Sequence, residues 1–434
     1  MDSFRISSRR NPRKARVAFG VLAAGGAVLL AACSSSSSSG TSPASAAGTA
    51  SAAASGGSSS SSPGANLSSL SSAVNAGAAI PSFSTYASQY GGKVGSTAGL
   101  KGKKIMIVPG DSALAACTEI AQADAALSTD LGMVPTIFAN QGTTAEHNTA
   151  IENAIHQGYA AIDLGCDYDP TTNAPAIAAA QKAGIVVAVY GATQQEVTAT
   201  NITDATADTY ALDAKLAADQ AIVQHNGQPF DAVAITSNAA PATGIMESSL
   251  KAELAASCPK CTLTEVNVEV PNWQTDVAGA VTSALLQHPN TTVLFPDYAG
   301  ELTYVLAGIQ AAHKSTSVKT YLAFGGGTPF IKLQTAQPGE SIIQSDIGGY
   351  PPWTGYLLVL QTVRGLEKMP AIAYSDAVGP NRIATPQNAD NVLATGGWGT
   401  SWVNGFRELL GLPDLSGTAL TSASTLNGAM VGTS

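Results

Sequence analysis

The chain has 434 residues and a formal net charge of −9, from 21 basic and 30 acidic side chains. Six of the basic residues and one acidic residue lie in the first 33 positions, so the remainder carries 15 basic and 29 acidic side chains, a net charge of −14. Nucleic acid is therefore excluded as a partner, because binding to phosphates requires an excess of Lys and Arg.

The N-terminus has the basic and apolar halves of a secretory signal. Six Arg and Lys residues precede an uncharged run over residues 17–30. A run of this length is short for a bilayer span, which disfavours a transmembrane helix. Arg9-Arg10 leaves twin-arginine export open, although Asn11 and Pro12 follow where that signal has apolar residues.

The segment Leu30-Ala31-Ala32-Cys33 resembles a bacterial lipobox. The resemblance implies that residues 1–33 are a lipoprotein signal peptide and that Cys33 becomes the lipidated first residue of the mature chain. The protein is then exported and anchored to the outer face of the cytoplasmic membrane. Residues 34–95 are dominated by Ser, Ala, Gly and Pro, which bury too little apolar surface to offset the entropy of ordering, so they predict a disordered linker.

Four cysteines remain for the exported region. Cys258 and Cys261 have CxxC spacing, but no second CxxC or nearby His pair completes a zinc site. In an oxidising compartment this spacing favours a small-loop disulfide over a redox motif. Cys117 and Cys166 each follow a predicted strand closely, so they can meet at one edge of a sheet, and we expect a second disulfide there.

Strands and helices alternate from residue 103 onwards. Residues 103–108 form an apolar run ended by Pro109-Gly110, and residues 118–131 then repeat apolar residues at helical spacing. The same pattern predicts further strands at 134–138, 160–164, 185–189, 232–235, 262–268, 293–295 and 320–324, and further helices at 144–157, 173–183, 210–224, 244–256, 274–287 and 300–311. This alternation is typical of parallel βαβ units with right-handed crossovers. We therefore predict an α/β fold with two doubly wound parallel sheets.

The order and spacing of these patterns resemble the type I periplasmic substrate-binding proteins of the ribose/galactose-binding kind, the receptor components of ABC importers. The resemblance runs from about Lys103 to Asn391, and the segments that carry it are residues 104–108, 148–163, 183–189, 270–276, 288–293 and 324–329. It implies two lobes joined by a hinge, an N-terminal lobe of residues 103–204 plus 347–385 and a C-terminal lobe of residues 205–346 plus 386–434. It also implies a monomer that delivers a small polar molecule, sugar-like or other, to permease subunits.

Ligands of open parallel sheets bind beyond the carboxyl ends of the strands, where loops and helix N-termini offer N–H groups. In this chain, those positions and the crossing near residues 344–350 predict a ligand cleft formed by Asp111, Ser112, Asp167, Tyr190, Gly191, Tyr298, Gly326, Thr328, Asp346 and Trp353. Structural roles stay open for several of them. Asp111 can cap a helix, the two tyrosines can pack at the surface, and glycines 325–327 can form a tight turn. Trp273 is predicted to lie in the core.

The predicted cleft departs from the pattern of sugar receptors. Tyr190-Gly191 stands where pentose and hexose receptors commonly have an Asp-Arg pair, and Gly325-Gly326-Gly327 stands where they have an aspartate turn. Sugars require planar bidentate groups for their hydroxyls and an aromatic face for the ring. We therefore expect a small-molecule ligand that is not a simple pentose or hexose.

No motif in the sequence indicates catalysis or a cofactor. GxSxG, HExxH and Walker-type glycine loops are absent, and the five histidines are scattered without metal-ligand spacing. We expect no enzyme activity, no cofactor and no metal. A lipid-anchored sensor that presents its ligand-bound form to a membrane receptor remains the alternative to an importer component.

Overall fold

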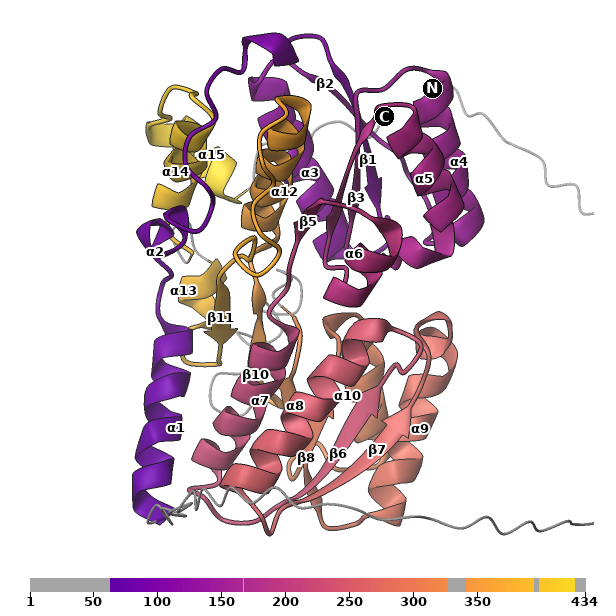
Figure 1. The fold of residues 1–434 in the computed structure, drawn as a ribbon. Coiled ribbons are helices and arrows are strands. Elements are labelled where there is room, and N and C mark those ends of the chain that lie inside the picture. The colour runs from indigo at the N-terminus through magenta and orange to yellow at the C-terminus, as the bar shows by residue number, and fades with distance from the viewer. Residues whose placement is uncertain (1–62, 167, 326–340, 394–397, 426–434) are drawn as a thin grey trace, which may run out of the picture. The chain divides into compact units, whose positions relative to one another are not determined.

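The computed structural model describes residues 63–166, 168–325, 341–393 and 398–425 (Figure 1). The predicted signal peptide with Cys33, and residues 34–62 of the predicted linker, lie outside the described residues. So do three of the predicted ligand residues, Asp167, Gly326 and Thr328.

The first lobe is built on a five-stranded parallel sheet in the order β2-β1-β3-β4-β5. Its strands are β1 (Lys104–Pro109), β2 (Val134–Ile137), β3 (Ala161–Gly165), β4 (Val186–Tyr190) and β5 (Asp204–Thr206). Ile105 and Ile107 pack with α3 (Ala115–Asp130) and α12 (Pro351–Leu366) on one face of the sheet. Met106 and Val108 pack on the other face with α4 (Thr144–His156), α5 (Ala174–Lys182) and α6 (Gln194–Thr200). Both faces are buried, which explains the continuous apolar run at residues 105–108.

The second lobe is built on a six-stranded sheet in the order β11-β10-β9-β8-β6-β7. Its strands are β6 (Asp231–Thr236), β7 (Thr262–Asn267), β8 (Thr291–Pro296), β9 (Lys319–Leu322), β10 (Ile343–Gly349) and β11 (Asn381–Ala384). Only the pair β10–β11 is antiparallel among the described strands. Helix α7 (Tyr210–Gln224) packs along α8 (Pro241–Ser257), and α9 (Trp273–Gln287) packs along α10 (Leu302–Ala311). The predicted α/β fold with two doubly wound, mainly parallel sheets is confirmed.

The lobe boundaries differ from those predicted. Residues 381–384 form β11, which pairs with β10 in the second sheet, although the prediction gave residues 347–385 to the first lobe. Conversely, α14 (Ser401–Leu409) packs through Trp402 and Phe406 against Trp353 of the first lobe, although residues 386–434 were predicted for the second. A short strand or helix does not encode in its own sequence which lobe receives it, because that depends on which edge or face is still uncovered.

The predicted linker is also wrong at its C-terminal end. Residues 63–95 contain α1 (Pro63–Ala78) and α2 (Phe83–Ala87). Leu70 and Val74, one helical turn apart, are buried in the core of the second lobe, and Phe83 is buried in the core of the first. The prediction of a disordered linker rested on average composition, which does not register a few spaced apolar side chains. These side chains pack against residues far away in the sequence. None of the helices described in the structure combines the length and apolar character needed to cross a membrane.

Both predicted cysteine pairs lie at disulfide distance. The pair Cys117–Cys166 joins the first turn of α3 to the end of β3, with the two Cα atoms 5.1 Å apart. The pair Cys258–Cys261 closes the turn between α8 and β7, with the Cα atoms 5.4 Å apart. Gly110 packs so closely on this part of the first lobe that a Cβ there would lie 1.7 Å from the carbonyl oxygen of Cys166, and the loop after β1 therefore requires glycine at this position.

We expect Phe83→Ala to lower the free energy of unfolding by about 3–5 kcal/mol, because it removes a buried aromatic ring from the first-lobe core. The matched control is Thr85→Ala, an exposed position in the same short helix, for which a change of less than about 0.5 kcal/mol is expected. Urea denaturation of the purified variants measures both. Equal, small effects would mean that residues 83–94 do not pack as described.

The two disulfides should differ in their contribution to stability. Cys117 and Cys166 are 49 residues apart, so replacing both by Ser should cost about 4 kcal/mol through loop entropy of the unfolded chain. Replacing Cys258 and Cys261, three residues apart, should cost about 2 kcal/mol. Urea denaturation gives the two values, and mass spectrometry of unreduced peptides checks the pairing. Recovery of all four as free thiols from the exported protein would contradict the assignment.

Candidate functional site

The loop after β1 carries two predicted site residues, Asp111 and Ser112. The Asp111 carboxylate accepts a hydrogen bond from the backbone N–H of Ala113 at 2.7 Å, so it stabilises the turn that leads into α3. Ser112 Oγ accepts a hydrogen bond from the backbone N–H of Asn140 at 3.1 Å, and Asn140 Nδ2 donates to the carbonyl of Pro109 at 2.8 Å. Both site residues are half-buried. Their loop is thus held to the loop after β2.

His147 on α4 supports the same loop and was not singled out from the sequence. Its Nε2 lies 3.0 Å from the carbonyl oxygen of Gly110, and its ring meets the Tyr168 ring edge-on at a centroid distance of 4.7 Å. Burial lowers the pKa of His147, which favours the neutral imidazole with a proton on the nitrogen that faces the carbonyl. The sequence gives no signal for this contact, because His147 and Gly110 are 37 residues apart.

The end of β4 is tied to the segments that connect the lobes. The Tyr190 hydroxyl donates a hydrogen bond to the Asp208 carboxylate. The Tyr210 hydroxyl donates to the carbonyl of Gly191 at 2.9 Å, and the Tyr374 hydroxyl donates to the carbonyl of Ala192 at 2.7 Å. The predicted residues Tyr190 and Gly191 therefore lie together, next to Asp208 and Tyr210 at the crossing from β5 to α7.

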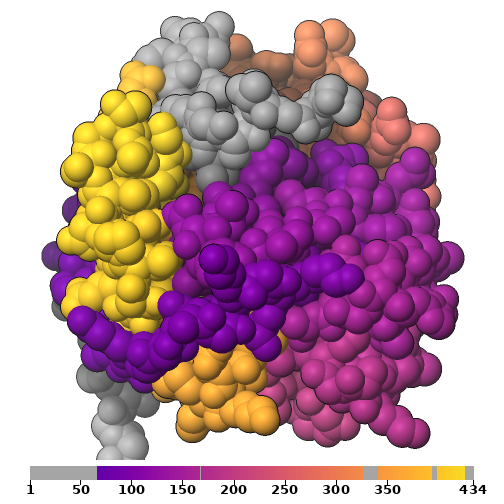
Figure 2. All heavy atoms as spheres, turned by 90° about the horizontal axis from the view of Figure 1, so that it is seen from above, coloured from indigo at the N-terminus to yellow at the C-terminus, as the bar shows by residue number. Residues whose placement is uncertain are grey.

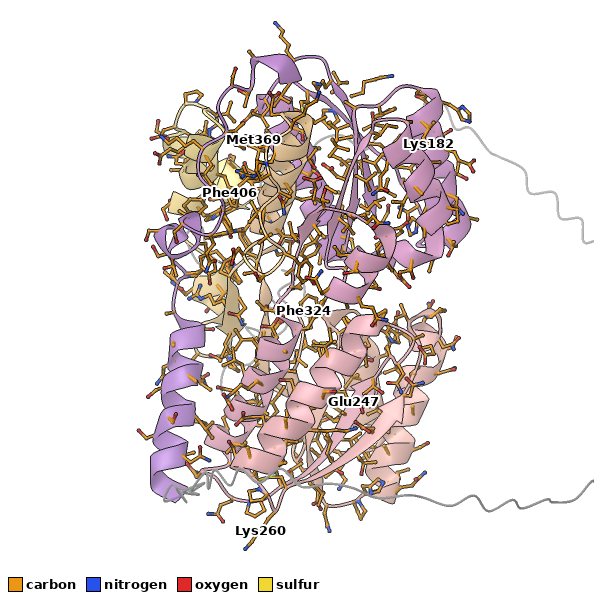
Figure 3. All side chains as sticks on the ribbon, in the orientation of Figure 1. Lys182, Glu247, Lys260, Phe324, Met369 and Phe406 are labelled. Carbon is orange, nitrogen blue, oxygen red and sulfur yellow. A yellow bond between two sulfur atoms is a disulfide. The ribbon has the colours of Figure 1, made fainter. Side chains whose placement is uncertain are left out.

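Aromatic rings continue from this crossing to the strand ends of the second lobe. Tyr210, Phe324, Tyr298 and Trp273, called here the aromatic row, have successive ring centroids 4.8, 6.1 and 6.0 Å apart. Phe324 is half-buried and lies two residues after the end of β9 (Figure 3). Trp273 is buried in the second-lobe core, as predicted, with its Nε1 donating to Ser237 Oγ at 2.9 Å. Sequence reasoning named Tyr298 but missed Phe324, although its place after a strand was a usable signal.

Asp346 lies within β10, in the crossing predicted near residues 344–350. Its carboxylate is packed against Gly325, where a Cβ would come within 1.8 Å of Oδ1, so close approach rather than a left-handed turn requires this glycine. Nearby Asp213 accepts hydrogen bonds from Asn381 Nδ2 at 2.6 Å and Thr209 Oγ1 at 2.8 Å. Burial raises the pKa of Asp213, and the charges of Asp208 and Asp346 raise it further. These three aspartates form one carboxylate cluster at the crossings.

The prediction that Trp353 lines the cleft is wrong. Its side chain is fully buried, its Nε1 donates to the Tyr90 hydroxyl at 3.0 Å, and its ring stacks on Trp402 at a centroid distance of 5.6 Å. The reason is that α14 and α2 cover the face of α12 that would otherwise point away from the sheet. Neither helix was predicted.

A pair of buried carboxyl groups, Asp297 and Glu301, follows β8, one residue before and three residues after Tyr298. Asp297 Oδ2 accepts hydrogen bonds from the Ser237 backbone N–H and from Thr243 Oγ1, both at 2.8 Å, and Glu301 Oε1 accepts one from the Asp297 backbone N–H at 3.1 Å. Burial raises the pKa of Asp297 to about 7 and that of Glu301 well above its usual range. Ionising both buried carboxyl groups would cost free energy through desolvation and mutual repulsion, so the pair retains a proton near neutral pH.

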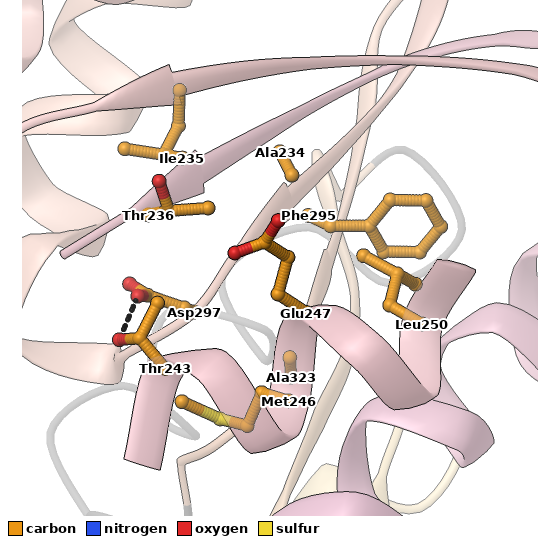
Figure 4. A pocket seen from close by; sticks show the side chains of 10 residues that line it. All are labelled: Ala234, Ile235, Thr236, Thr243, Met246, Glu247, Leu250, Phe295, Asp297 and Ala323. Atoms are coloured by element: carbon orange, nitrogen blue, oxygen red, sulfur yellow. Dashed lines mark hydrogen bonds between the residues drawn. The ribbon is translucent and has the colours of Figure 1, made fainter. Parts of the chain in front are cut away.

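The pocket beside Asp297 is too small for a solute. It lies between α8 and the sheet, with Thr243 bonded to Asp297 at one end and Phe295 and Leu250 at the other (Figure 4). Its volume of about 10 Å³ corresponds to roughly one water molecule. The candidate ligand site therefore consists of the aromatic row and the carboxylate cluster. In the part of the chain that the structure describes, no group of three or more His, Cys, Asp or Glu side chains is placed to hold a metal ion.

Residues 105–366 match the family described as periplasmic binding protein domain. No curated protein sequence matches the chain. Among solved structures, a solute-binding protein of an ABC transporter from Agrobacterium vitis with bound allitol is similar at 19% identity and a TM-score of 0.56, with 68% of this chain and 98% of that chain covered. A 5-methylthioribose transporter solute-binding protein from Thermotoga lettingae is similar at 16% identity and a TM-score of 0.57, with 75% and 99% covered. These identities establish likeness of fold.

We expect the buried pair Asp297–Glu301 to make stability depend on pH. Because the folded state raises the pKa of Asp297 from its usual value to about 7, the folded protein holds a proton that the unfolded chain releases, and the free energy of unfolding falls as pH rises from about 4 to 7. In Glu301→Gln the side chain at position 301 no longer titrates, so its raised pKa stops contributing to the pH dependence and the decrease should be smaller.

Urea denaturation at pH 5 and pH 8 measures this difference. Glu152→Gln, an exposed position on α4, is the control and should keep the wild-type pH dependence. A Glu301→Gln variant that loses as much stability between the two pH values as the wild type would show that the pair does not hold the proton.

Proposed function

Since the chain belongs to the periplasmic binding protein family, we propose that it is the exported receptor of an ABC importer and binds a small polyhydroxylated solute at the strand ends of its two lobes. The observation that carries this proposal is the aromatic row. It leads from the second lobe through Phe324 to Tyr210, whose hydroxyl reaches Gly191 of the first lobe. The carboxylate cluster adjoins it at the crossings between lobes.

These two groups have the chemistry that polyols and sugars require. Aromatic faces pack against the C–H surface of such solutes, and carboxylates accept hydrogen bonds from neighbouring hydroxyls. Asp208 supplies a half-buried carboxylate next to Tyr190, and Phe324 supplies a half-buried ring. The full proposed ligand set comprises Asp111, Ser112, Tyr190, Gly191, Asp208, Tyr298, Phe324 and Asp346.

The proposed ligand is a sugar alcohol or a substituted sugar rather than an unmodified pentose or hexose. Tyr190-Gly191 stands in place of the Asp-Arg pair that pentose and hexose receptors commonly carry, so an arginine fork for vicinal hydroxyls is missing at this position. The relatives from Agrobacterium vitis and Thermotoga lettingae carry allitol and 5-methylthioribose, ligands of this broader class.

The proposed location is the outer face of the cytoplasmic membrane. The lipobox Leu30–Cys33 supports attachment through a diacylglyceryl group on Cys33, and the 29 residues from Ser34 to Ser62 separate that anchor from α1. A chain of that composition leaves the receptor free to reach a permease in the same membrane.

A matching solute should stabilise the protein by about 2.7 kcal/mol at one hundred times its dissociation constant, because it binds the folded state alone. We expect this in a thermal-shift series with allitol, ribitol, 5-methylthioribose, D-allose and D-glucose, with the first three as the strongest candidates. Phe324→Ala and Asp208→Asn should each weaken binding at least about tenfold, the equivalent of one lost contact of about 1.4 kcal/mol.

Tyr159→Ala is the matched control, because Tyr159 is an aromatic residue that precedes β3 and therefore lies at the opposite edge of the first sheet from the strand ends. The folded variant should bind like the wild type. The proposed site is wrong if Phe324→Ala binds the stabilising solute as tightly as Tyr159→Ala does, and the proposed ligand class is wrong if no polyol or sugar stabilises the protein.

A further inference from the structure

The segment that precedes the family-matched region is attached to the second lobe through α1. Leu70 and Val74 are buried in the core of that lobe. Gly77 packs on β11 so closely that a Cβ there would lie 2.9 Å from Ile383 Cδ1. Arg382 Nε donates a hydrogen bond to the carbonyl of Ala78 at 3.0 Å, which places a positive charge at the C-terminal end of the helix, where it is favourable.

The same segment is attached to the first lobe a few residues later. The Phe83 ring lies 5.1 Å from the Phe406 ring and 5.6 Å from the Trp353 ring, centroid to centroid. Tyr90 is fully buried and accepts the hydrogen bond of Trp353 Nε1. The backbone N–H of Val94 donates to the carbonyl of Leu409 at 2.7 Å. Figure 2 shows the indigo N-terminal segment lying against the yellow C-terminal helices.

Only residues 79–82 join these two attachments. From Ala78 to Phe83 there are five Cα–Cα steps, which span at most about 18 Å when fully extended. Three of the four linking residues are exposed, Ile80 being 50% exposed. The link is therefore short and mostly exposed, while both of its ends are held by buried side chains.

The segment also contacts a crossing between the lobes. The Tyr90 hydroxyl donates a hydrogen bond to the carbonyl of Val378 at 2.9 Å. Val378 pairs with Ala207 of the β5–α7 crossing, and the backbone N–H of Ala207 donates to the carbonyl of Ala377 at 2.8 Å. The Tyr90 side chain thus connects the N-terminal segment to the crossing at Val378 and, through it, to the crossing at Ala207. The lobes would turn about these crossings.

We propose that residues 63–94 act as a strap that limits the separation of the lobes and thereby sets the population of the open form. The lobes cannot move the two attachments further apart than the link reaches unless α1 or the Phe83–Tyr90 side chains leave their cores. The strap lies outside the family-matched residues 105–366. It therefore adds one connection between the lobes to the crossings that lie within the matched region. It rests on the proposed function only in that ligand binding closes the lobes, and ligand-free protein is sufficient to test it.

The test lengthens the link and measures the distance between the lobes. Eight Gly and Ser residues are inserted between Ile80 and Pro81 of the full chain carrying Cys33→Ser, with spin labels at Glu152→Cys on α4 and Leu286→Cys on α9, both exposed positions. The control carries the same insertion between Asn226 and Gly227, in the exposed turn that joins α7 to β6 within the second lobe.

Pulsed electron paramagnetic resonance without ligand should give a broader distribution with a larger mean distance for the strap insertion, and an unchanged distribution for the control. Identical distributions for both insertions would overturn the strap. Should the strap insertion lose its cooperative thermal transition, an insertion of four Gly and Ser residues at the same place replaces it, because it still lengthens the link, by at most about 14 Å, and adds less flexible chain. It should broaden the distribution as well, and a wild-type distribution would again overturn the proposal.

These distances are independent of the solute series described above. A failure of every polyol to stabilise the protein would leave the distance result standing, and unchanged distances alongside clear solute binding would remove the strap without removing the proposed receptor function.

Discussion

The parallel pairing of strands is the constraint on which the candidate site depends. Because β1 pairs in parallel with β2 and β3, and β6 with β7 and β8, every loop that follows these strands emerges at the same edge of its sheet. Residues as distant in sequence as Asp111 and Tyr190, or Tyr298 and Phe324, thus gather at strand ends without any local signal that relates them. The sheet topology therefore decides which side chains come together at the site, and the individual side chains then decide its chemistry.

Both lobes bury carboxyl groups close to these edges. Asp163 on β3 accepts a hydrogen bond from Thr362 Oγ1 at 2.5 Å and lies beside Asp124 of α3, and burial raises the pKa of Asp163 to about 7. Asp297 and Glu301 form the corresponding pair in the second lobe. Burying two charges would cost several kcal/mol, so a retained proton is the less expensive arrangement. Each pair joins a strand to the helices packed on it and helps to fix the geometry of the strand ends.

Elements outside the family-matched region complete the first-lobe core. Phe83, Tyr90 and Trp402 come from the two ends of the chain and meet on α12, whose residues from Pro351 to Arg364 are all buried. This aromatic packing explains why the N-terminal segment is ordered despite its polar composition. It also means that the lobes are connected by more of the chain than their sheets alone would require, which is the physical basis of the proposed strap.

The sequence by itself determined the order of most strands and helices from residue 103 to 324, because those strands are runs of apolar residues and those helices repeat them at their own period, whereas the short α6 and β5 were not predicted. It also identified the cysteine pairs and the buried position of Trp273. Tertiary structure alone decided that Trp353 is covered by α14, that β11 joins the second sheet, and that residues 63–95 are ordered. It likewise placed Phe324 against Tyr210, a contact across more than a hundred residues. Local hydrophobic periodicity indicates which residues are buried. It does not indicate which distant residues they pack against, because that depends on the packing of the whole chain.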